Sequence, residues 1–305
     1  MRPPTPHREL LDAGVLSRLA RIPLHARHPM LGSVTGAHRS ATRGSSVEFA
    51  EYRKYVAGDD TKHVDWRVFA RTDRFYMKEF EADTNLRCTL ALDVSGSMAF
   101  GARHGSRLDL ARRLAAHLAF LLTRQGDAVG LSLFGGTRAV DIPPRRSGAH
   151  LRHVLDTLTA VKAGGRGDLV EGLHRIADRT PRRGLVIVLS DLFAEIEPLL
   201  DSFQHMRFQK HDLAVFHLLD PLEIDFDFDR PIRFVDLEGS DRLITDPAVV
   251  AEGYRRAFRT WLEALTRGSR EFGADYQLVR AGEPLERVLS AFLLRRTRTG
   301  AGGGR

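Results

Sequence analysis

An aspartate and two serines directly follow a short apolar stretch of the chain. The stretch at residues 88–92 ends at Asp93, and Ser95 and Ser97 follow at intervals of two residues. One carboxylate and two hydroxyls are hard oxygen ligands, which magnesium, calcium and manganese prefer. The spacing therefore predicts that Asp93, Ser95 and Ser97 converge on a divalent metal ion, with magnesium as the first candidate.

A second carboxylate follows another apolar stretch, because residues 185–189 are succeeded by Ser190 and Asp191. In open parallel sheets ligands bind beyond the carboxyl ends of the strands, so Asp191 is expected at the same edge as Asp93. Serine and aspartate also follow strands simply to start loops. For the whole cluster we favour the metal site, with positions left for water or an incoming ligand.

Alternating strands and helices are predicted from residue 86 onward, as in an open, mostly parallel α/β sheet flanked by helices. A Gly-Gly-Thr turn should join two strands into a hairpin. Residues 224–237 are expected to form short strands around Pro231, either as an edge hairpin or as a partner-binding insertion. Strands are expected at 88–92, 127–134, 138–142, 185–189, 213–219 and 276–279, and helices at 107–124, 149–158, 168–178, 195–208, 247–272 and 284–294.

The Asp-x-Ser-x-Ser sequence after an apolar strand resembles the metal-ion-dependent adhesion site (MIDAS) of von Willebrand factor A domains. The order of elements in residues 86–295 is similar to that family's, which implies a von Willebrand factor A-like, Rossmann-like sheet. The resemblance assigns Asp93, Ser95 and Ser97 to the first metal loop and Asp191 to the third. It implies protein binding rather than catalysis, and we expect a partner's carboxylate to complete the ion's coordination.

The second metal loop departs from that family. Where Gly-Gly-Thr followed by Asp or Asn is usual, this chain has Gly165-Arg166-Gly167-Asp168, so Gly167 replaces the threonine and one oxygen ligand is missing. Water could replace the hydroxyl, since magnesium retains water readily, while Arg166 would weaken cation binding. Asp168 either orients a metal-bound water or caps the next helix with Glu171, and we favour the cap.

The preceding segment is similar to the family listed as domain of unknown function 58. The resemblance covers about residues 36–295 and rests on a Gly-Asp-Asp…Asp-Trp-Arg spacing among other motifs. It implies a lead-in joined to a von Willebrand factor A-like domain, and a MoxR-type AAA+ ATPase partner in protein assembly or activation. A charged and aromatic cluster in this lead-in either fixes a loop through ion pairs or docks a partner: Arg53, Asp59, Asp60, Asp65, Trp66, Arg67 and Arg71.

Four segments are predicted along the chain. Residues 1–45 form a basic, partly flexible segment with a short amphipathic helix near residues 9–19. Residues 46–85 form the lead-in, packed on the main domain and including a strand at 75–80. Residues 86–295 form the main domain, and residues 296–305 form a disordered tail.

The composition limits location and partners. The net charge of +7 comes from 46 basic and 39 acidic residues spread along the chain, so nucleic acid is not expected as a partner. Cys88 is the only cysteine, which suits a reducing compartment. Without a signal peptide or a long apolar stretch, no membrane span is expected and a cytoplasmic location is predicted.

Enzymatic function is not favoured. The sequence has no G-x-S-x-G elbow, no H-E-x-x-H, no phosphate-binding G-x-x-x-x-G-K-[ST] loop and no dinucleotide fingerprint after the first strand. Two alternatives to metal-dependent partner binding stay open. One is a metal-free scaffold that docks through the lead-in, and the other is a magnesium-dependent phosphatase acting at Asp93.

Overall fold

The computed structural model describes residues 9–27 and 86–301, except for residues 138, 181–182, 229–231, 236 and 239–241. It also describes His7, Val68 and the backbone of four strands between residues 38 and 84. The chain divides into two compact units, each of which has most of its contacts within itself. One unit joins residues 1–27 to residues 87–305, and the other is the intervening segment, residues 28–86.

The intervening unit contains two antiparallel strand pairs. Strand β1 (His38–Arg39) pairs with β4 (Asp83–Thr84), and β2 (Glu48–Lys54) pairs with β3 (Tyr76–Glu81). The strand predicted at residues 75–80 is therefore confirmed as β3. Arg53 is paired with Met77 in this ladder, whereas six members of the predicted lead-in cluster lie outside the described residues: Asp59, Asp60, Asp65, Trp66, Arg67 and Arg71.

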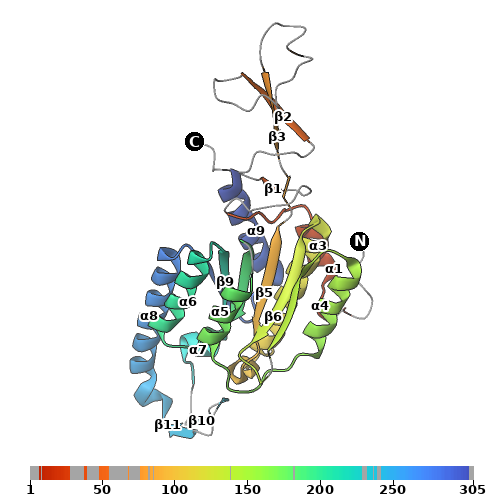
Figure 1. The fold of residues 1–305 in the computed structure, drawn as a ribbon. Helices are drawn as coiled ribbons and strands as arrows, with labels where there is room; N and C mark the ends of the chain where they lie inside the picture. Colours follow the sequence, from red (N-terminus) through yellow and green to blue (C-terminus); the bar gives the residue numbers. More distant parts are fainter. Residues whose placement is uncertain are drawn as a thin grey trace. The chain divides into compact units, whose positions relative to one another are not determined.

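The larger unit is built on one six-stranded sheet with the order β12-β9-β8-β5-β6-β7 (Figure 1). All neighbouring strands are parallel except β6 and β7, which form the predicted hairpin. When the six strands are numbered by their order in the chain and the sheet is read from β7 to β12, the strand order is 3-2-1-4-5-6, which is the order of doubly wound sheets. The strand order reverses its direction between β5 and β8. The strands are β5 (Arg87–Asp93), β6 (Ala128–Phe134), β7 (Val140–Arg145), β8 (Leu185–Ser190), β9 (Asp212–Leu219) and β12 (Asp275–Arg280).

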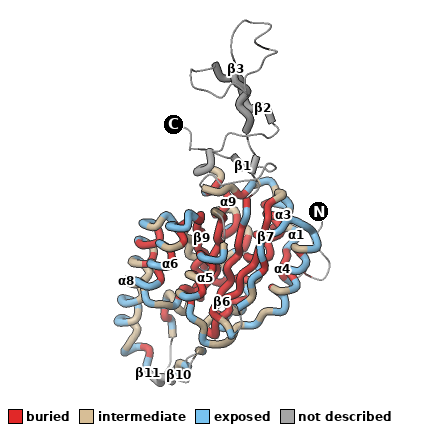
Figure 2. Tube along the Cα trace, viewed as in Figure 1, coloured by how far each residue is buried: buried red, intermediate tan, exposed pale blue. Residues whose placement is uncertain are grey.

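Helices cover both faces of this sheet, and β6, β8 and β9 are buried along their whole length (Figure 2). That burial explains their nearly continuous apolar sequences. On one face lie α3 (Arg107–Gln125), α4 (Gly148–Ala160) and α9 (Leu285–Ala301). On the other lie α5 (Leu169–Arg179), α6 (Ile196–Phe208) and α8 (Pro247–Glu271). No described helix has both the length and the apolar character needed to cross a membrane.

Local signals set the ends of the long helices. Ser106 accepts a hydrogen bond from the Asp109 amide, and the Asp109 side chain accepts one from the Ser106 amide, so the two residues form a capping box at the start of α3. Gly126 ends this helix with φ of 94°, a left-handed conformation that favours glycine. Pro247 occupies the first turn of α8, directly after the N-cap Asp246, a position that suits proline.

The N-terminal segment is packed against the domain where it is described. Helix α1 (Ala13–Leu19) is capped by Asp12, and the amphipathic helix predicted near residues 9–19 is confirmed. Helix α1 lies against α3 and α9. Its buried side chains are Val15, Leu16 and Leu19. Leu24 and Gln125 exchange two hydrogen bonds of 2.9 Å, which fasten the end of this segment to the end of α3.

The prediction for residues 224–237 was wrong in part. Residues 224–225 end a short helix, α7 (Pro221–Asp225), because Asp220 and Glu223 form a capping box around Pro221. Strand β10 (Ile232–Val235) does follow Pro231, and it pairs with β11 (Arg242–Thr245) in a separate two-stranded sheet. The segment is therefore an insertion with its own hairpin, and it is not an edge of the main sheet.

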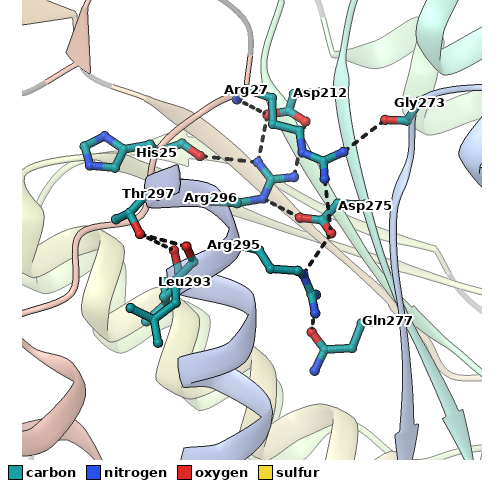
Figure 3. Close-up of polar contacts among 11 residues, drawn as sticks. His25, Arg27, Asp212, Gly273, Asp275, Gln277, Leu293, Arg295, Arg296 and Thr297 are labelled. Carbon is teal, nitrogen blue, oxygen red and sulfur yellow. Dashed lines mark hydrogen bonds and ion pairs between the residues drawn. The ribbon is translucent and has the colours of Figure 1, made fainter. Parts of the chain in front are cut away.

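The predicted tail boundary at residue 295 was also wrong. Helix α9 continues to Ala301, and Arg296 is completely buried. Its guanidinium lies 2.7 Å from Asp212 Oδ2 and 3.0 Å from Asp275 Oδ2, at the first residues of β9 and β12 (Figure 3). The backbone of Arg27 donates a further hydrogen bond to Asp212, so this ion cluster joins the N-terminal segment, the sheet and α9.

Buried histidines predict a loss of stability in acid. His217 on β9 is fully buried, with Nδ1 2.6 Å from the Tyr276 hydroxyl, and burial lowers its pKa to about 3. Below pH 6.5 His217 therefore binds a proton in the unfolded chain but stays neutral in the folded chain down to about pH 3. The free energy of unfolding falls as the pH drops through this range. Burial lowers the pKa of His117 and His211 in the same direction.

We expect His217→Gln to flatten this dependence. Between pH 6 and pH 4 the free energy of unfolding of the wild type should fall more steeply than that of the variant, by about 1.4 kcal/mol per pH unit. Urea unfolding at pH 7, 6, 5 and 4 measures both slopes, with exposed His153→Gln as the control. Identical slopes for wild type and His217→Gln would show that His217 is protonated without cost in the folded state.

Candidate functional site

The loop after β5 is held by backbone hydrogen bonds to the end of β6 and to the loop before α5. The Val94 amide donates to the Phe134 carbonyl at 2.9 Å, and the Gly96 amide donates to the Gly165 carbonyl at 3.0 Å. In return the Gly164 amide donates to the Val94 carbonyl at 3.0 Å. These bonds place the loop at the edge where β5 and β8 end, which is the crevice that doubly wound sheets use for ligands.

Asp93, the last residue of β5, is 2% exposed. Its Oδ1 accepts a hydrogen bond from the Ser95 amide at 2.9 Å, and its Oδ2 accepts one from the Ser190 hydroxyl at 2.6 Å. The hydroxyls of Ser95 and Ser97 lie 2.9 Å apart. The structure therefore brings the three first-loop residues together, and it adds Ser190 as a direct partner of the Asp93 carboxylate.

Asp191 follows β8 at the same edge and is 3% exposed. Its Oδ1 accepts a hydrogen bond from the Phe193 amide at 3.2 Å. Its Oδ2 lies 3.1 Å from Arg107 Nη2 but has no hydrogen-bond partner among the described residues. Burial, and secondly the charge of Asp191, raises the pKa of Asp93 to about 7. Two buried carboxylates thus repel each other here.

Arg107 and Glu223 belong to the site but were not predicted from the sequence. Arg107 is buried at the first turn of α3, with Nη1 2.6 Å from Glu223 Oε1. Its Nη2 donates to the Ser97 carbonyl, so one guanidinium contacts the loop after β5 and two carboxylates. Of the acidic residues near this edge of the sheet, Asp191 and Glu223 therefore contact Arg107, whereas the Asp93 carboxylate is held by two serines.

The second loop supplies no side-chain oxygen at Gly167, as the sequence indicated. A Cβ built on Gly167 would lie 2.2 Å from the carbonyl carbon and oxygen of Gly135. Gly135 has φ of 77°, and a Cβ on it would lie 2.5 Å from Asp93 Oδ1. The two glycines therefore allow the backbone of these loops to approach Asp93, and that approach leaves no room for a threonine at position 167.

Asp168 is the N-cap of α5, which confirms the interpretation we favoured. Its side chain accepts a hydrogen bond from the Glu171 amide at 2.9 Å. Both Asp168 and Arg166 are exposed. The cap accounts for the position of the Asp168 carboxylate without a metal-bound water.

The donor set fits a hard cation that keeps water in its coordination shell. Within the described ranges, no group of three or more His, Cys, Asp or Glu side chains is placed to hold a metal ion. An ion here would depend on Asp93, Asp191 and the hydroxyls of Ser95 and Ser97. Magnesium suits such a set, because it binds one or two carboxylates and retains several waters.

An aromatic cavity of about 510 Å³ adjoins these residues. Its polar lining includes Ser97, Arg107 and Asp191. The rest is largely apolar and comes from the loops after the 3-10 helix η3 (Gly96–Ala99) and after β8, from α7 and the residues after it, from α8 and from the β10–β11 insertion. Phe193, next to Asp191, lies at the cavity and is 83% exposed. The apolar lining consists of Phe100, Phe193, Leu222, Phe226, Phe228, Phe234, Val235, Leu237 and Tyr254.

The strand order, the antiparallel hairpin at one edge and the Asp-x-Ser-x-Ser loop at the switch point define an α/β protein with a von Willebrand factor A-like fold. The chain belongs to the family described as "Protein of unknown function DUF58", whose model matches residues 51–268.

Proteins of two mycobacteria are similar to this chain in sequence. The uncharacterized proteins Rv1480 of Mycobacterium tuberculosis and Mb1516 of Mycobacterium bovis are each 28% identical over 219 residues, covering 70% of this chain and 68% of the relative. Among solved structures, BatB from Bacteroides thetaiotaomicron is similar with 17% identity and a TM-score of 0.45, covering 70% of this chain and 100% of BatB. The SpRpn10 VWA domain is similar with 14% identity and a TM-score of 0.41, covering 72% and 100%.

Proposed function

We propose that this chain is a non-catalytic protein-interaction module whose partner binds through a divalent metal ion. Asp93, Ser95, Ser97 and Asp191 hold the ion, which is magnesium, with calcium or manganese as substitutes. The observation that carries this proposal is the pair of buried carboxylates at the switch point, beside two serine hydroxyls 2.9 Å apart. The bound ion supplies an open coordination position for one carboxylate from the partner.

Electrostatics supports a cation at this place. The pKa of Asp93 is raised to about 7, so its ionised form is poorly stabilised by the protein alone. Asp191 Oδ2 is buried without a hydrogen bond among the described residues. A divalent ion would stabilise both ionised carboxylates, whereas Arg107 is already shared with Glu223.

The proposed partner is a MoxR-type AAA+ ATPase or one of its client proteins, in the assembly or activation of other proteins. The choice of partner comes from the resemblance of the lead-in motif to domain of unknown function 58 proteins, the family to which the chain belongs. The exposed Phe193 and the aromatic cavity beside Asp191 offer apolar surface of the kind that partner proteins bind.

A metal-free scaffold is the second candidate, and two observations favour it. Arg107 already places a positive charge 3.1 Å from Asp191, and Gly167 provides no hydroxyl. In that case the partner would dock through the lead-in cluster that includes Arg53 and Trp66. The phosphatase alternative gains no support, because Ser95 stands where aspartyl phosphatases have their second aspartate.

We expect Asp93→Asn to abolish partner binding without unfolding the protein. The variant removes a buried charge, so its free energy of unfolding should not fall, while metal affinity should drop by at least about tenfold. The tagged wild type, Asp93→Asn and the exposed control Glu252→Gln would be used to capture partners from native lysate, in magnesium and in EDTA, with identification by mass spectrometry.

An AAA+ ATPase retained by wild type and Glu252→Gln only in magnesium, and lost in Asp93→Asn, supports metal-dependent docking. The same ATPase retained equally in EDTA would move the interface away from Asp93 and favour the metal-free scaffold.

A further inference from the structure

Arg107 contacts two of the four residues that are proposed to hold the metal ion. It is 5% exposed, and its Nη2 lies 3.1 Å from Asp191 Oδ2 and donates a hydrogen bond to the Ser97 carbonyl. The guanidinium carries a fixed positive charge, because arginine is not deprotonated in proteins. The chain therefore already places a cation of its own beside Asp191.

The two carboxylate oxygens of Asp191 differ in their surroundings. Oδ1 accepts a hydrogen bond from the Phe193 amide at 3.2 Å, whereas Oδ2 is buried and accepts none from any described residue. Oδ2 is thus the oxygen that is left for an ion, and it is also the oxygen that Arg107 faces. Like charges so close together repel strongly in a buried site. A metal ion and the guanidinium therefore compete for the same oxygen.

Arg107 has other contacts that can hold it when Asp191 turns to an ion. Its Nη1 lies 2.6 Å from Glu223 Oε1, and its guanidinium carbon lies 5.2 Å from the centre of the Phe100 ring. Glu223 is itself fixed in the capping box of α7, where its Oε2 accepts a hydrogen bond from the Asp220 amide at 2.9 Å. Neither contact involves Asp191, so the guanidinium can give up Asp191 and stay buried.

We propose that Arg107 is a tethered counter-ion that competes with the metal for Asp191 and so sets the metal affinity of the site. The inference rests on the proposed function, since it requires an ion held by Asp93 and Asp191. In the metal-free chain the guanidinium neutralises Asp191. When the ion binds, Arg107 leaves Oδ2 and remains with Glu223. Arg107 is thus a positioning residue and is not a ligand of the ion.

A purely structural role for Arg107 predicts the opposite change in metal affinity. If Arg107 only supports the loop after β5, its removal frees the Ser97 carbonyl and weakens metal binding. If Arg107 is a competitor, its removal strengthens metal binding, even though the metal-free chain becomes less stable because Asp191 and Glu223 lose their shared cation. The sign of the change therefore separates the two roles.

The experiment is a calorimetric titration of the metal-free full chain with Mn²⁺. Arg107→Gln is expected to bind Mn²⁺ at least about tenfold more tightly than the wild type, because a like charge beside the ion has been removed. Arg107→Lys keeps the positive charge and should bind Mn²⁺ like the wild type. Arg113→Gln removes an exposed positive charge from the same helix, α3, and should also match the wild type.

A measurement on the wild type covers the case in which Arg107→Gln does not fold. The Nε–H group of Arg107 gives a signal in a proton–nitrogen correlation spectrum, which is identified by its absence from the spectrum of Arg107→Lys. Saturating Mg²⁺ should shift this signal in the wild type, because the guanidinium moves away from Asp191. The same addition should leave the signal in place in Asp93→Asn.

The outcomes distinguish this proposal from the proposed function. Equal or weaker Mn²⁺ binding by a folded Arg107→Gln protein, or an unmoved Arg107 signal in the Mg²⁺-saturated wild type, would overturn the competition and keep the metal site. Binding of Mn²⁺ by neither the wild type nor folded Arg107→Gln would contradict the metal site itself, and this proposal with it.

Discussion

Replacing Arg296 by methionine is expected to lower the free energy of unfolding by about 3–5 kcal/mol. Arg296 is fully buried and forms ion pairs with Asp212 and Asp275, which are themselves 3% and 4% exposed. Methionine fills much of the volume but leaves both carboxylates without their main cation. The remaining nearby cations, Arg27 and Arg295, lie 3.5 Å from Asp275 and are more exposed.

The neighbouring Arg295→Met variant is the matched control, and urea unfolding measures both. Arg295 pairs with the same Asp275, but its side chain is 42% exposed. Its removal should therefore cost no more than about 1 kcal/mol. Equal losses for the two variants, or a loss under about 1 kcal/mol for Arg296→Met, would mean that the buried cluster in Figure 3 does not hold the C-terminal helix to the sheet.

Introducing threonine at position 167, where related adhesion sites carry one, is expected to damage the site instead of completing it. The new Cβ would meet the Gly135 backbone at 2.2 Å, so the loops must separate. We expect a loss of stability of about 1–3 kcal/mol or more from this overpacking. Metal affinity should fall as well, because Gly135 lies against the Asp93 carboxylate.

Gly164→Ala is the control for this substitution. Gly164 lies in the same loop, and a Cβ added to it would meet nothing within 4 Å. This variant should therefore unfold at the same urea concentration as the wild type and bind metal equally well. A Gly167→Thr protein that gains metal affinity with unchanged stability would show that the second loop can supply the missing oxygen after all.

Local sequence signals were sufficient to predict most of the main domain. The strands β5, β8 and β9 are largely apolar because both faces of the sheet are covered. Helix α3 is bounded by Ser106 and Gly126, two cap residues that can be recognised in the sequence. The first metal loop was predicted for the same reason, since Asp93, Ser95 and Ser97 are neighbours in the chain.

The features that were missed depend on contacts between distant residues. Arg107 donates a hydrogen bond to Glu223, which lies 116 residues away in the sequence, and the Ser97 amide donates one to Glu238, which lies 141 residues away. No local sequence pattern can relate residues at such separations. Arg296 was placed in a tail because the sequence around it is basic and ends in glycines. Its partners Asp212 and Asp275 are brought to it only by the parallel pairing of β9 and β12.

Calorimetric titration of the metal-free chain with magnesium, beside Asp93→Asn, tests the central claim most directly. We expect the wild type to bind one ion per chain with competition from manganese, and Asp93→Asn to show no binding heat while remaining folded. Absence of saturable magnesium or manganese binding by a folded wild type, or equal binding by Asp93→Asn, would contradict a metal site built on Asp93, Ser95, Ser97 and Asp191.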